Sequence, residues 1–494
     1  MSGDSSATIA RNAFHLVLGQ VATTILAIFF SAALGRLLGA EDFGVFFLIT
    51  TTCTFAYVLV EWGQPLFVIR AVAKEPPRAG DLIGAALALR AALAAAATLP
   101  VALIAWALGY GARTTWLSVA MMAALLPLCL AQGYGMAFRA HDQMGRDALV
   151  SVLNKAFALA IALPALALGT GIGGVVVAQG VAGALALGVA LRLYSRLGAT
   201  PLRVSPATVR ELLAGGAPIL AMTAAVSVQP YLDAVILAKL VPPAVVGWFG
   251  AAKTILGTLT APATILGAAA YPRLARLSED AAALRREVRA ALRPLLWLGA
   301  LAATGTFLFA EAAIDLVYGS GGFGPAASVL QASAPGIFLV FVDTLLGITI
   351  YACGWGTGFA IAKIVSVVVG TGLDFLLIPV FQSRFGNGGI AVVVAFALSE
   401  IVVTLGALFV LRRGTLEARA GLDVLRALAA AGATVLAFQL LPRLPFPVGV
   451  PLCVAVFAAA SLGLGLVGRR DLHLLWSTLR RSGGSAAADD GAAR

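Results

Sequence analysis

Long apolar segments dominate this sequence and limit the folds that it can adopt. Of the 494 residues, 60% are hydrophobic and only 12% are charged, about half the charged share of an average soluble domain. Many apolar runs exceed about 20 residues, which is enough for a helix to cross about 30 Å of hydrocarbon. Because backbone N–H and C=O groups find no water there, such runs must form helices. The sequence therefore predicts an all-α polytopic membrane protein.

The apolar runs predict about fourteen transmembrane helices with short connections. They lie at 12–35, 43–69, 82–109, 115–138, 148–168, 173–191, 214–239, 247–271, 294–318, 326–352, 359–380, 389–411, 424–441 and 448–467. The N-terminal sequence MSGDSSATIARN lacks the pattern of a cleavable signal peptide, so we expect the first run to remain as a helix. Residues 468–494 are small and polar, so we expect this tail to be disordered.

Lysine and arginine residues fall mainly in alternate connections. With the N-terminus on side one, 25 of the 34 lie on that side, five lie on the other, and four lie within the spans. The positive-inside rule makes side one cytoplasmic and places both termini there. The net charge of +11 then reflects topology and contact with anionic lipids, and no nucleic-acid role is expected. The basic stretch 275–296 is predicted to form an amphipathic helix on the cytoplasmic surface that links the two lobes.

Cysteine and histidine residues give no sign of a redox or metal site. Each of the four cysteines lies inside an apolar run, and none belongs to a Cys-x-x-Cys pair. This favours buried small hydrophobic residues. The three histidines are far apart in the sequence. We therefore expect no bound metal.

A segment after the first span occurs twice. LGRLLGAEDFGVFFLIT, which starts at residue 34, aligns with LAKLVPPAVVGWFGAAK after a shift of 203 residues, so Arg36 pairs with Lys239 and Gly44 with Gly247. We expect the first copy to be an outer turn, with Gly39 and Gly44 framing a tight reversal. The shift covers six helices, an even number, so the two copies share one orientation and form a parallel repeat. The predicted domains are a cytoplasmic N-terminus at 1–11, a first six-helix lobe at 12–191, a cytoplasmic linker at 192–213, a second six-helix lobe at 214–411, two further helices within 424–467 and the tail 468–494.

Five passages, in order along the chain, resemble one family. They are LGRLLGAEDFGVFFL, GAPILAMTAAVSVQPYLDAVILAKLVPPAVVGWFGAAKTI, AYPRLARL, YGSGGFGPAASVLQ and LIPVFQSRFGNGGIAVV. Together they resemble the bacterial polysaccharide transporters, which are lipid-linked oligosaccharide flippases of the multidrug/oligosaccharidyl-lipid/polysaccharide exporter superfamily. The likeness covers residues from about 10 to 470. The fifth passage departs from the family pattern by an extra Gln-Ser-Arg stretch before its glycines.

The resemblance implies two lobes around a central cavity that opens alternately to either side of the bacterial inner membrane. The implied cargo is a polyprenyl-pyrophosphate-linked oligosaccharide, which moves from the cytoplasmic to the outer leaflet for O-antigen, capsule or exopolysaccharide synthesis. The implied partners are membrane lipids, a glycan polymerase and other polysaccharide-assembly proteins. A transporter of this kind is not an enzyme.

Basic residues inside the predicted spans are the candidates for binding the anionic pyrophosphate. They are Arg90, Lys155, Lys253 and Lys363. Charges at such depth are costly and mark transport paths or buried pairs. Arg90 is the deepest, and its planar guanidinium suits a phosphate clamp, with Lys253 facing it from the second lobe. Lys363 lies near enough to the cytoplasmic end to snorkel, and for Lys155 and Lys253 snorkelling and cavity lining both remain open.

Acidic residues inside the spans are the candidates for coupling or gating. They are Glu61, Asp233, Asp343, Asp374 and Glu400. Asp343 and Glu400 are deep, so they either pair with a base or bind a coupling ion, which could be H⁺ or Na⁺. Asp233 matches a recurring acid of the family, and we favour a lobe-packing or gating salt bridge for it. No other cofactor is expected.

Two other functional classes fit the sequence less well. A multidrug or cation antiporter of the same superfamily typically has twelve spans and should carry acids rather than bases in its cavity. The two additional helices argue against it. A membrane enzyme such as a glycan polymerase would need a sizeable outer loop, and every predicted outer loop is short.

Overall fold

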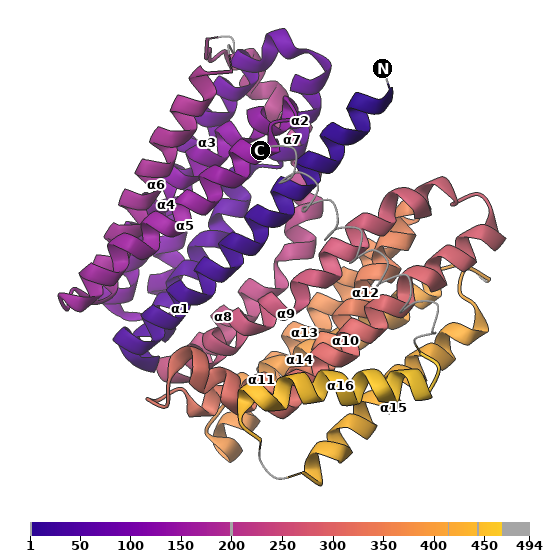
Figure 1. Ribbon diagram of the computed structural model, residues 1–494. Coiled ribbons are helices and arrows are strands. Elements are labelled where there is room, and N and C mark those ends of the chain that lie inside the picture. Colours follow the sequence, from indigo (N-terminus) through magenta and orange to yellow (C-terminus); the bar gives the residue numbers. More distant parts are fainter. Residues whose placement is uncertain (1, 198–200, 413, 442–443, 467–494) are drawn as a thin grey trace, which may run out of the picture. The chain divides into compact units, whose positions relative to one another are not determined.

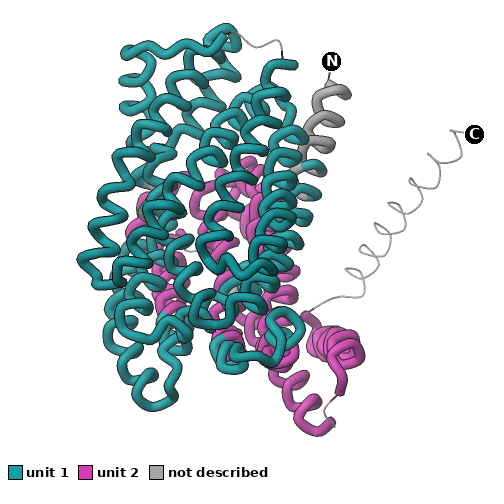
Figure 2. Tube along the Cα trace, turned by 90° about the vertical axis from the view of Figure 1, so that its left-hand side faces the viewer, with its two compact units in different colours: residues 1–258, 313–329, 363–395 teal, residues 259–312, 330–362, 396–494 magenta. Residues whose placement is uncertain are grey.

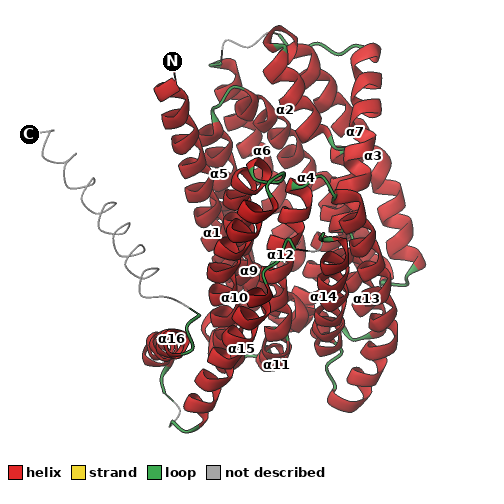
Figure 3. Cartoon of the chain, turned by 90° about the vertical axis from the view of Figure 1, so that its right-hand side faces the viewer, coloured by secondary structure: helices red, strands yellow, loops and turns green. Residues whose placement is uncertain are grey.

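The computed structural model describes residues 2–197, 201–412, 414–441 and 444–466. Helices joined by short turns make up these residues, and no β-strand occurs within them (Figures 1 and 3). The predicted all-α fold is therefore confirmed. The tail that we expect to be disordered, 468–494, lies outside the described residues.

The helices begin and end close to the predicted apolar runs. In chain order they are α1 Ser2–Glu61, α2 Gln64–Lys74, the short 3₁₀ helix η1 Pro76–Arg78, α3 Ala79–Ala107, α4 Gly111–Ala140, α5 Met144–Ala167, α6 Gly171–Ser195, α7 Pro206–Ser227, α8 Gln229–Leu240, α9 Pro243–Arg276, α10 Ala281–Tyr318, α11 Gly324–Ala332, α12 Ala334–Ala352, α13 Gly356–Phe385, α14 Gly389–Val410, α15 Ala418–Gln439 and α16 Phe446–Gly463. α1 thus begins upstream of residue 12, where the first span was predicted to start.

Twelve helical segments of the described chain are long and apolar enough to cross a membrane, judged by length and composition. The sequence predicted fourteen spans, and the two counts differ for two reasons. One segment, Leu18–Lys74, contains the first two predicted spans. The seventh predicted span, 214–239, is divided between α7 and α8 around Val228. Pro230 lies in the first turn of α8, where its missing N–H costs no helical hydrogen bond.

α1 contains the turn that the sequence predicted between the first two spans. Gly39 has a φ of 75° and a ψ of 173°, and it separates two helices; residues with a side chain rarely adopt this conformation. Phe30 and Phe46 would lie about 24 Å apart along an unbroken helix, yet their ring centroids are 6.4 Å apart. The chain therefore reverses direction at Gly39, as predicted.

A second break separates α1 from α2 and is held by α7. Trp62 and Gly63 have φ values of 48° and 66°. A Cβ atom on Gly63 would lie 2.4 Å from the carbonyl oxygen of Gly216, so only glycine allows this approach of the two backbones. The indole N–H of Trp62 donates a hydrogen bond to the carbonyl oxygen of Leu213 at 3.0 Å. These contacts fix the break against α7.

The chain divides into two compact units (Figure 2). Unit 1 comprises Met1–Thr258, Ala313–Val329 and Lys363–Ala395, and unit 2 comprises Leu259–Ala312, Leu330–Ala362 and Phe396–Arg494. In unit 1, α4 packs against α3 and α6, and α5 packs against α1 and α6. Small residues such as Ala137 and Ala186 are fully buried among these helices, which lets the helix backbones approach closely.

In unit 2, the last two helices pack on α10 through aromatic side chains. The ring of Trp297 lies 5.7 Å from that of Phe457 in α16. The ring of Phe309 lies 5.8 Å from Phe438 in α15 and 5.9 Å from Phe446 in α16, both edge-on. Edge-to-face contacts of this kind add to the apolar area that aromatic residues bury. α15 and α16 are therefore an integral part of unit 2.

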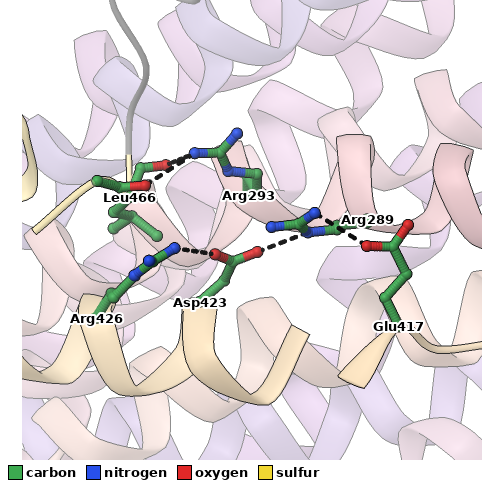
Figure 4. A network of polar contacts seen from close by, with 7 residues as sticks. Arg289, Arg293, Glu417, Asp423, Arg426 and Leu466 are labelled. Atoms are coloured by element: carbon green, nitrogen blue, oxygen red, sulfur yellow. Dashed lines mark hydrogen bonds and ion pairs between the residues drawn. The ribbon is translucent and has the colours of Figure 1, made fainter. Parts of the chain in front are cut away.

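A network of ion pairs joins the start of α10 to α15 (Figure 4). Asp423 has no exposed side-chain area, and it accepts hydrogen bonds from Nε of Arg289 at 2.9 Å and from Arg426 at 3.2 Å. Arg289 also lies 2.9 Å from Glu417. Because Asp423 is buried and has two cationic partners, the loss of its charge would leave Arg426 without its carboxylate partner and Arg289 with Glu417 alone.

The stretch 275–296, predicted to be an amphipathic surface helix, is helical over most of its length. Residues 281–296 are the first turns of α10, which continues into the predicted span and has non-helical backbone angles at Phe309. Asp280 caps this helix by accepting hydrogen bonds from the backbone N–H groups of Ala282 and Ala283, each at 3.0 Å, and these bonds lower the pKa of Asp280. The basic face of this segment forms ion pairs through Arg289, and its location at the cytoplasmic surface stays a prediction.

Candidate functional site

The deepest predicted base, Arg90, lies in a buried polar cluster of unit 1. Its side chain comes from α3, and the residue is 0% exposed. Nε donates to Oε1 of Gln64 at 3.0 Å, and Nη1 donates to the carbonyl oxygen of Cys129 at 2.8 Å. Nη2 lies 3.7 Å from the carboxylate of Glu61. Arg90 thus contacts three other helices, α1, α2 and α4.

These contacts place Arg90 across the break between α1 and α2. Glu61 is the last residue of α1 and Gln64 is the first residue of α2, so one guanidinium holds the two helix ends together. The Glu61 side chain is 35% exposed, whereas that of Arg90 is 1% exposed. The role of Arg90 as a phosphate clamp stays a prediction, because in this conformation its guanidinium is enclosed by protein groups.

Three predicted charges meet at a second cluster in unit 1. Asp233 of α8 and Asp374 of α13 are 3% and 1% exposed. Their carboxyl groups are within hydrogen-bonding reach of each other, and the ammonium of Lys253 in α9 attracts both. The Lys253 ammonium also lies 5.2 Å from the centre of the Phe249 ring, a favourable position for a cation.

The two carboxyl groups of this cluster need a proton or a cation between them. A hydrogen bond between two carboxyl groups forms only when one of them is protonated. With both ionised, neither oxygen of Asp374 has a hydrogen-bond donor in the described part of the chain. A single proton, together with the charge of Lys253, would make the three groups electrically neutral. The sequence predicted the two acids for coupling or gating and Lys253 for substrate binding, and the structure brings the three together.

Lys155 differs from Arg90 and Lys253 because it has no counter-charge among the residues that the structure describes. It lies half-buried in α5, and among the residues that the structure describes none forms an ion pair or a hydrogen bond with its ammonium. The preceding residue, Asn154, is buried, and its Oδ1 has no donor among the described residues. A buried ammonium without a counter-charge is costly in a membrane span. A role for Lys155 in binding the anionic pyrophosphate stays a prediction.

Two of the remaining predicted acids lie in unit 2. Asp343 of α12 and Glu400 of α14 are each 4% exposed. The hydroxyl of Thr404 lies within hydrogen-bonding distance of the Asp343 carboxylate and of the Glu400 backbone carbonyl, so it connects the two helices. Lys363 of α13 is half-buried and belongs to unit 1. A coupling role for the two acids, and a substrate-binding role for Lys363, stay predictions.

At the end of unit 1 that carries Gly39, two helices related by the repeat cross in close contact. A Cβ atom on Gly44 would lie 2.0 Å from the carbonyl oxygen of Pro243, and a Cβ on Gly247 would lie 2.0 Å from the carbonyl oxygen of Ala40. The shift of 203 residues relates Gly44 to Gly247 and Ala40 to Pro243, so the two contacts are equivalent. The predicted parallel repeat is therefore seen directly as a pseudo-twofold contact that only glycine permits.

The two repeat-related bases make equivalent contacts at the same end. Arg36 donates to the carbonyl oxygens of Val317 at 2.9 Å and Leu316 at 2.6 Å, at the C-terminal end of α10. Lys239 donates to the carbonyl oxygen of Leu108 at 2.6 Å, just after α3. α3 and α10 correspond to the third and ninth predicted spans, so each base caps a helix of the opposite repeat. We call the glycine crossing and these two caps the latch.

Sequence reasoning found the residues of the latch but missed their contacts. Arg36 and Lys239 were identified only as matching positions of a repeat. The sequence did contain a signal for these contacts. Both copies of the repeat carry a base, Arg36 or Lys239, and a glycine eight residues later, Gly44 or Gly247. The break before α2 was also missed, although Gly63 followed by Pro65 is a typical start of a helix.

Comparison with known proteins identifies the family. The family model described as "Polysaccharide biosynthesis protein" matches residues 9–278, which is more than half of the chain. The chain belongs to this family. The resemblance inferred from the five passages is thereby confirmed. A search of curated protein sequences finds no match.

Solved structures with the same fold are transporters. The structure named "Lipid II flippase MurJ, inward closed conformation" has a TM-score of 0.73 and 13% identity, and covers 90% of this chain and 98% of its own. An inward-facing multidrug resistance MATE family transporter of the MOP superfamily has a TM-score of 0.64 and 16% identity, with 78% and 94% covered. The Vibrio cholerae MATE transporter VcmN in the bent form has a TM-score of 0.54 and 15% identity, with 84% and 100% covered. At these identities the likeness establishes the fold of a polytopic membrane transporter.

Proposed function

We propose that this chain is a flippase that moves a polyprenyl-pyrophosphate-linked oligosaccharide from the cytoplasmic to the outer leaflet of the bacterial inner membrane. Membership of a polysaccharide biosynthesis family and the likeness to a lipid II flippase support this proposal. The observation that carries it is Lys155, a half-buried base within a predicted span that has no counter-charge in the described residues. An anionic pyrophosphate would supply that counter-charge. The product would be used by a glycan polymerase and other assembly proteins to make O-antigen, capsule or exopolysaccharide.

Alternating access would operate through the latch. The distribution of lysine and arginine supports cytoplasmic termini and therefore an outward-facing latch. With the latch closed, the cargo would load from the cytoplasmic side. Separation of the two repeats at the Gly44–Gly247 crossing would then open the outer side. Both caps would have to break in this step, since each one joins the two repeats.

Coupling would take place at the cluster of Asp233, Asp374 and Lys253. With one proton bound, the cluster is neutral, and without it the cluster carries one net negative charge inside the protein. Because a buried net charge is costly, gain and loss of the proton would favour different conformations. The coupling ion is H⁺ or Na⁺, and the ammonium of Lys253 favours H⁺ because it already supplies a positive charge beside the two acids.

A multidrug or cation antiporter of the same superfamily is the alternative. The likeness to MATE transporters and the buried acids of the coupling cluster favour it. The two proposals differ at Lys155, because a cationic cargo would be repelled by an ammonium that attracts an anionic one. Replacement of this residue therefore separates them.

The test is glycan export by Lys155 variants in the native host. We expect Lys155→Met to abolish surface glycan and to accumulate lipid-linked oligosaccharide on the cytoplasmic side, whereas Lys155→Arg should retain most export because it keeps the charge. Arg113→Ala is a matched control, since that side chain is 64% exposed. Normal export by Lys155→Met at equal protein levels would contradict the anion site. A change in drug resistance with normal glycan would favour the antiporter.

A further inference from the structure

Unit 1 contains a cavity of about 220 Å³ next to the latch. Both halves of α1 line it, together with Tyr231 of α8 and Thr254 of α9. Phe43, Phe46 and Phe47 give it aromatic walls. No basic or acidic side chain is among its lining residues. None of the charged residues predicted from the sequence therefore accounts for this cavity.

Three threonines in the second half of α1 line this cavity, and their hydroxyls lack the usual helical partner. A threonine within a helix commonly donates to the carbonyl four residues earlier, as Thr52 does to Leu48 at 2.9 Å. The hydroxyl of Thr50 is buried and has no partner among the described residues. Thr51 and Thr54 make no side-chain hydrogen bond within the described part of the chain. The cavity therefore presents one buried hydroxyl without a partner, that of Thr50, a costly arrangement unless a polar ligand completes it, and two more accessible hydroxyls that are available to the same ligand.

Aromatic walls beside a row of hydroxyls suit a sugar ring. The C–H faces of a pyranose are apolar and pack on aromatic rings, while its edge carries hydroxyls that donate and accept hydrogen bonds. A prenyl tail would leave the threonine hydroxyls unsatisfied, and a pyrophosphate would find no base among the lining residues. The volume is below the range of about 300–1,000 Å³ for larger ligands, so it fits one ring rather than a whole oligosaccharide.

The surroundings of the cavity also favour the glycan over the phosphate. At its latch side, Ser31 is hydrogen-bonded to Tyr318 at 2.7 Å. In the other direction, Glu61 lies seven residues beyond Thr54, which is on the same face of α1, and its charge acts on Tyr231. This carboxylate forms an ion pair with Arg90 and is 35% exposed, and it can accept hydrogen bonds from sugar hydroxyls.

We propose that the cavity lined by Thr50, Thr51 and Thr54, the threonine pocket, binds one sugar ring of the lipid-linked glycan. The inference rests on the proposed function and extends it, because it assigns the residues that read the sugar. The pocket would make affinity depend on the sugar that the pyrophosphate carries. Its position beside the latch would place the bound ring where opening to the outer side begins.

The test compares two lipids bound to the purified full chain in lipid nanodiscs. The probes are polyprenyl pyrophosphate and the same lipid carrying a single N-acetylhexosamine, and the measurement is the dissociation constant of each. We expect the sugar to raise the affinity of the wild type by about tenfold, the effect of one or two neutral hydrogen bonds. The triple variant Thr50→Val/Thr51→Val/Thr54→Val should lose this gain and bind the sugar-free lipid as the wild type does.

Two single variants guard against a folding defect. Thr54 is exposed, so Thr54→Val should fold normally, and the increase in affinity that the sugar gives should be about threefold smaller than in the wild type. Thr52→Val should keep the full increase, because the Thr52 hydroxyl donates to the carbonyl oxygen of Leu48 in its own helix. Two results would overturn the inference. In one, the triple variant would prefer the sugar-bearing lipid as strongly as the wild type does; in the other, the wild type would bind both lipids with equal affinity. If the wild type bound neither lipid, the proposed function itself would fail.

Discussion

Replacement of Arg90 by alanine is expected to destabilise unit 1 strongly. The substitution leaves Oε1 of Gln64 and the carbonyl oxygen of Cys129 without the donors that they have at 3.0 and 2.8 Å. A buried acceptor without a donor costs about 1–3 kcal/mol, and breaking a buried ion pair costs about 3–5 kcal/mol. Because the Glu61 side chain is 35% exposed, water recovers part of its loss. The two acceptors alone would cost about 2–6 kcal/mol, and the ion pair adds part of its value, so we expect a total of at least about 3 kcal/mol.

Thermal unfolding of the purified protein in detergent measures this effect. We expect the Tm of Arg90→Ala to fall by at least roughly 5 °C. Arg90→Lys should be intermediate, because an ammonium cannot reproduce the planar donor geometry of the guanidinium. Arg113→Ala is the control, since its ion pair with Asp42 is largely exposed and should contribute less than about 1 kcal/mol.

One result would refute this reasoning about Arg90. If Arg90→Ala unfolded at the wild-type temperature and lost affinity for polyprenyl pyrophosphate, the residue would be a phosphate clamp and its buried contacts would be incidental. An unchanged affinity with a lowered Tm would establish Arg90 as the residue that holds α1 and α2 together at their break.

Three further predictions concern the latch, the coupling cluster and unit 2. Gly247→Ala should force the helix crossing apart and raise maleimide labelling of Ser31→Cys several-fold, whereas Gly257→Ala, where a Cβ meets no atom within 4 Å, should not. Asp374→Asn should make transport in proteoliposomes insensitive to a pH gradient, because the amide cannot gain or lose the proton; a response equal to that of the wild type would contradict proton coupling at this cluster. Asp423→Asn should leave Arg426 without its carboxylate partner and Arg289 with Glu417 alone, and so speed hydrogen exchange in α15; an unchanged exchange rate would mean that the network does not hold this helix.

The sequence alone predicts most of the fold but little of the site. Apolar runs fix where the helices lie, because their length and composition suit the membrane, and the repeat of Gly44 and Gly247 predicts two related halves. Which charges face each other depends on helix rotation, and a shift of one residue turns a side chain by about 100°. For this reason the contact of Arg90 with Gln64 could not be predicted. The meeting of Asp233 with Asp374 could not be predicted either, since these residues come from helices far apart in the sequence.

The most direct measurement is the movement of a lipid-linked oligosaccharide across the bilayer of proteoliposomes that contain only this chain. The cargo would start in the inner leaflet, and its arrival in the outer leaflet would be followed with a glycan-modifying enzyme that cannot enter the vesicles. We predict that the wild type makes the glycan accessible well above the rate in empty liposomes and that Lys155→Met does not. If the glycan stayed protected with the wild type while the same vesicles transported a cationic drug, the chain would be an antiporter and the flippase proposal would be wrong.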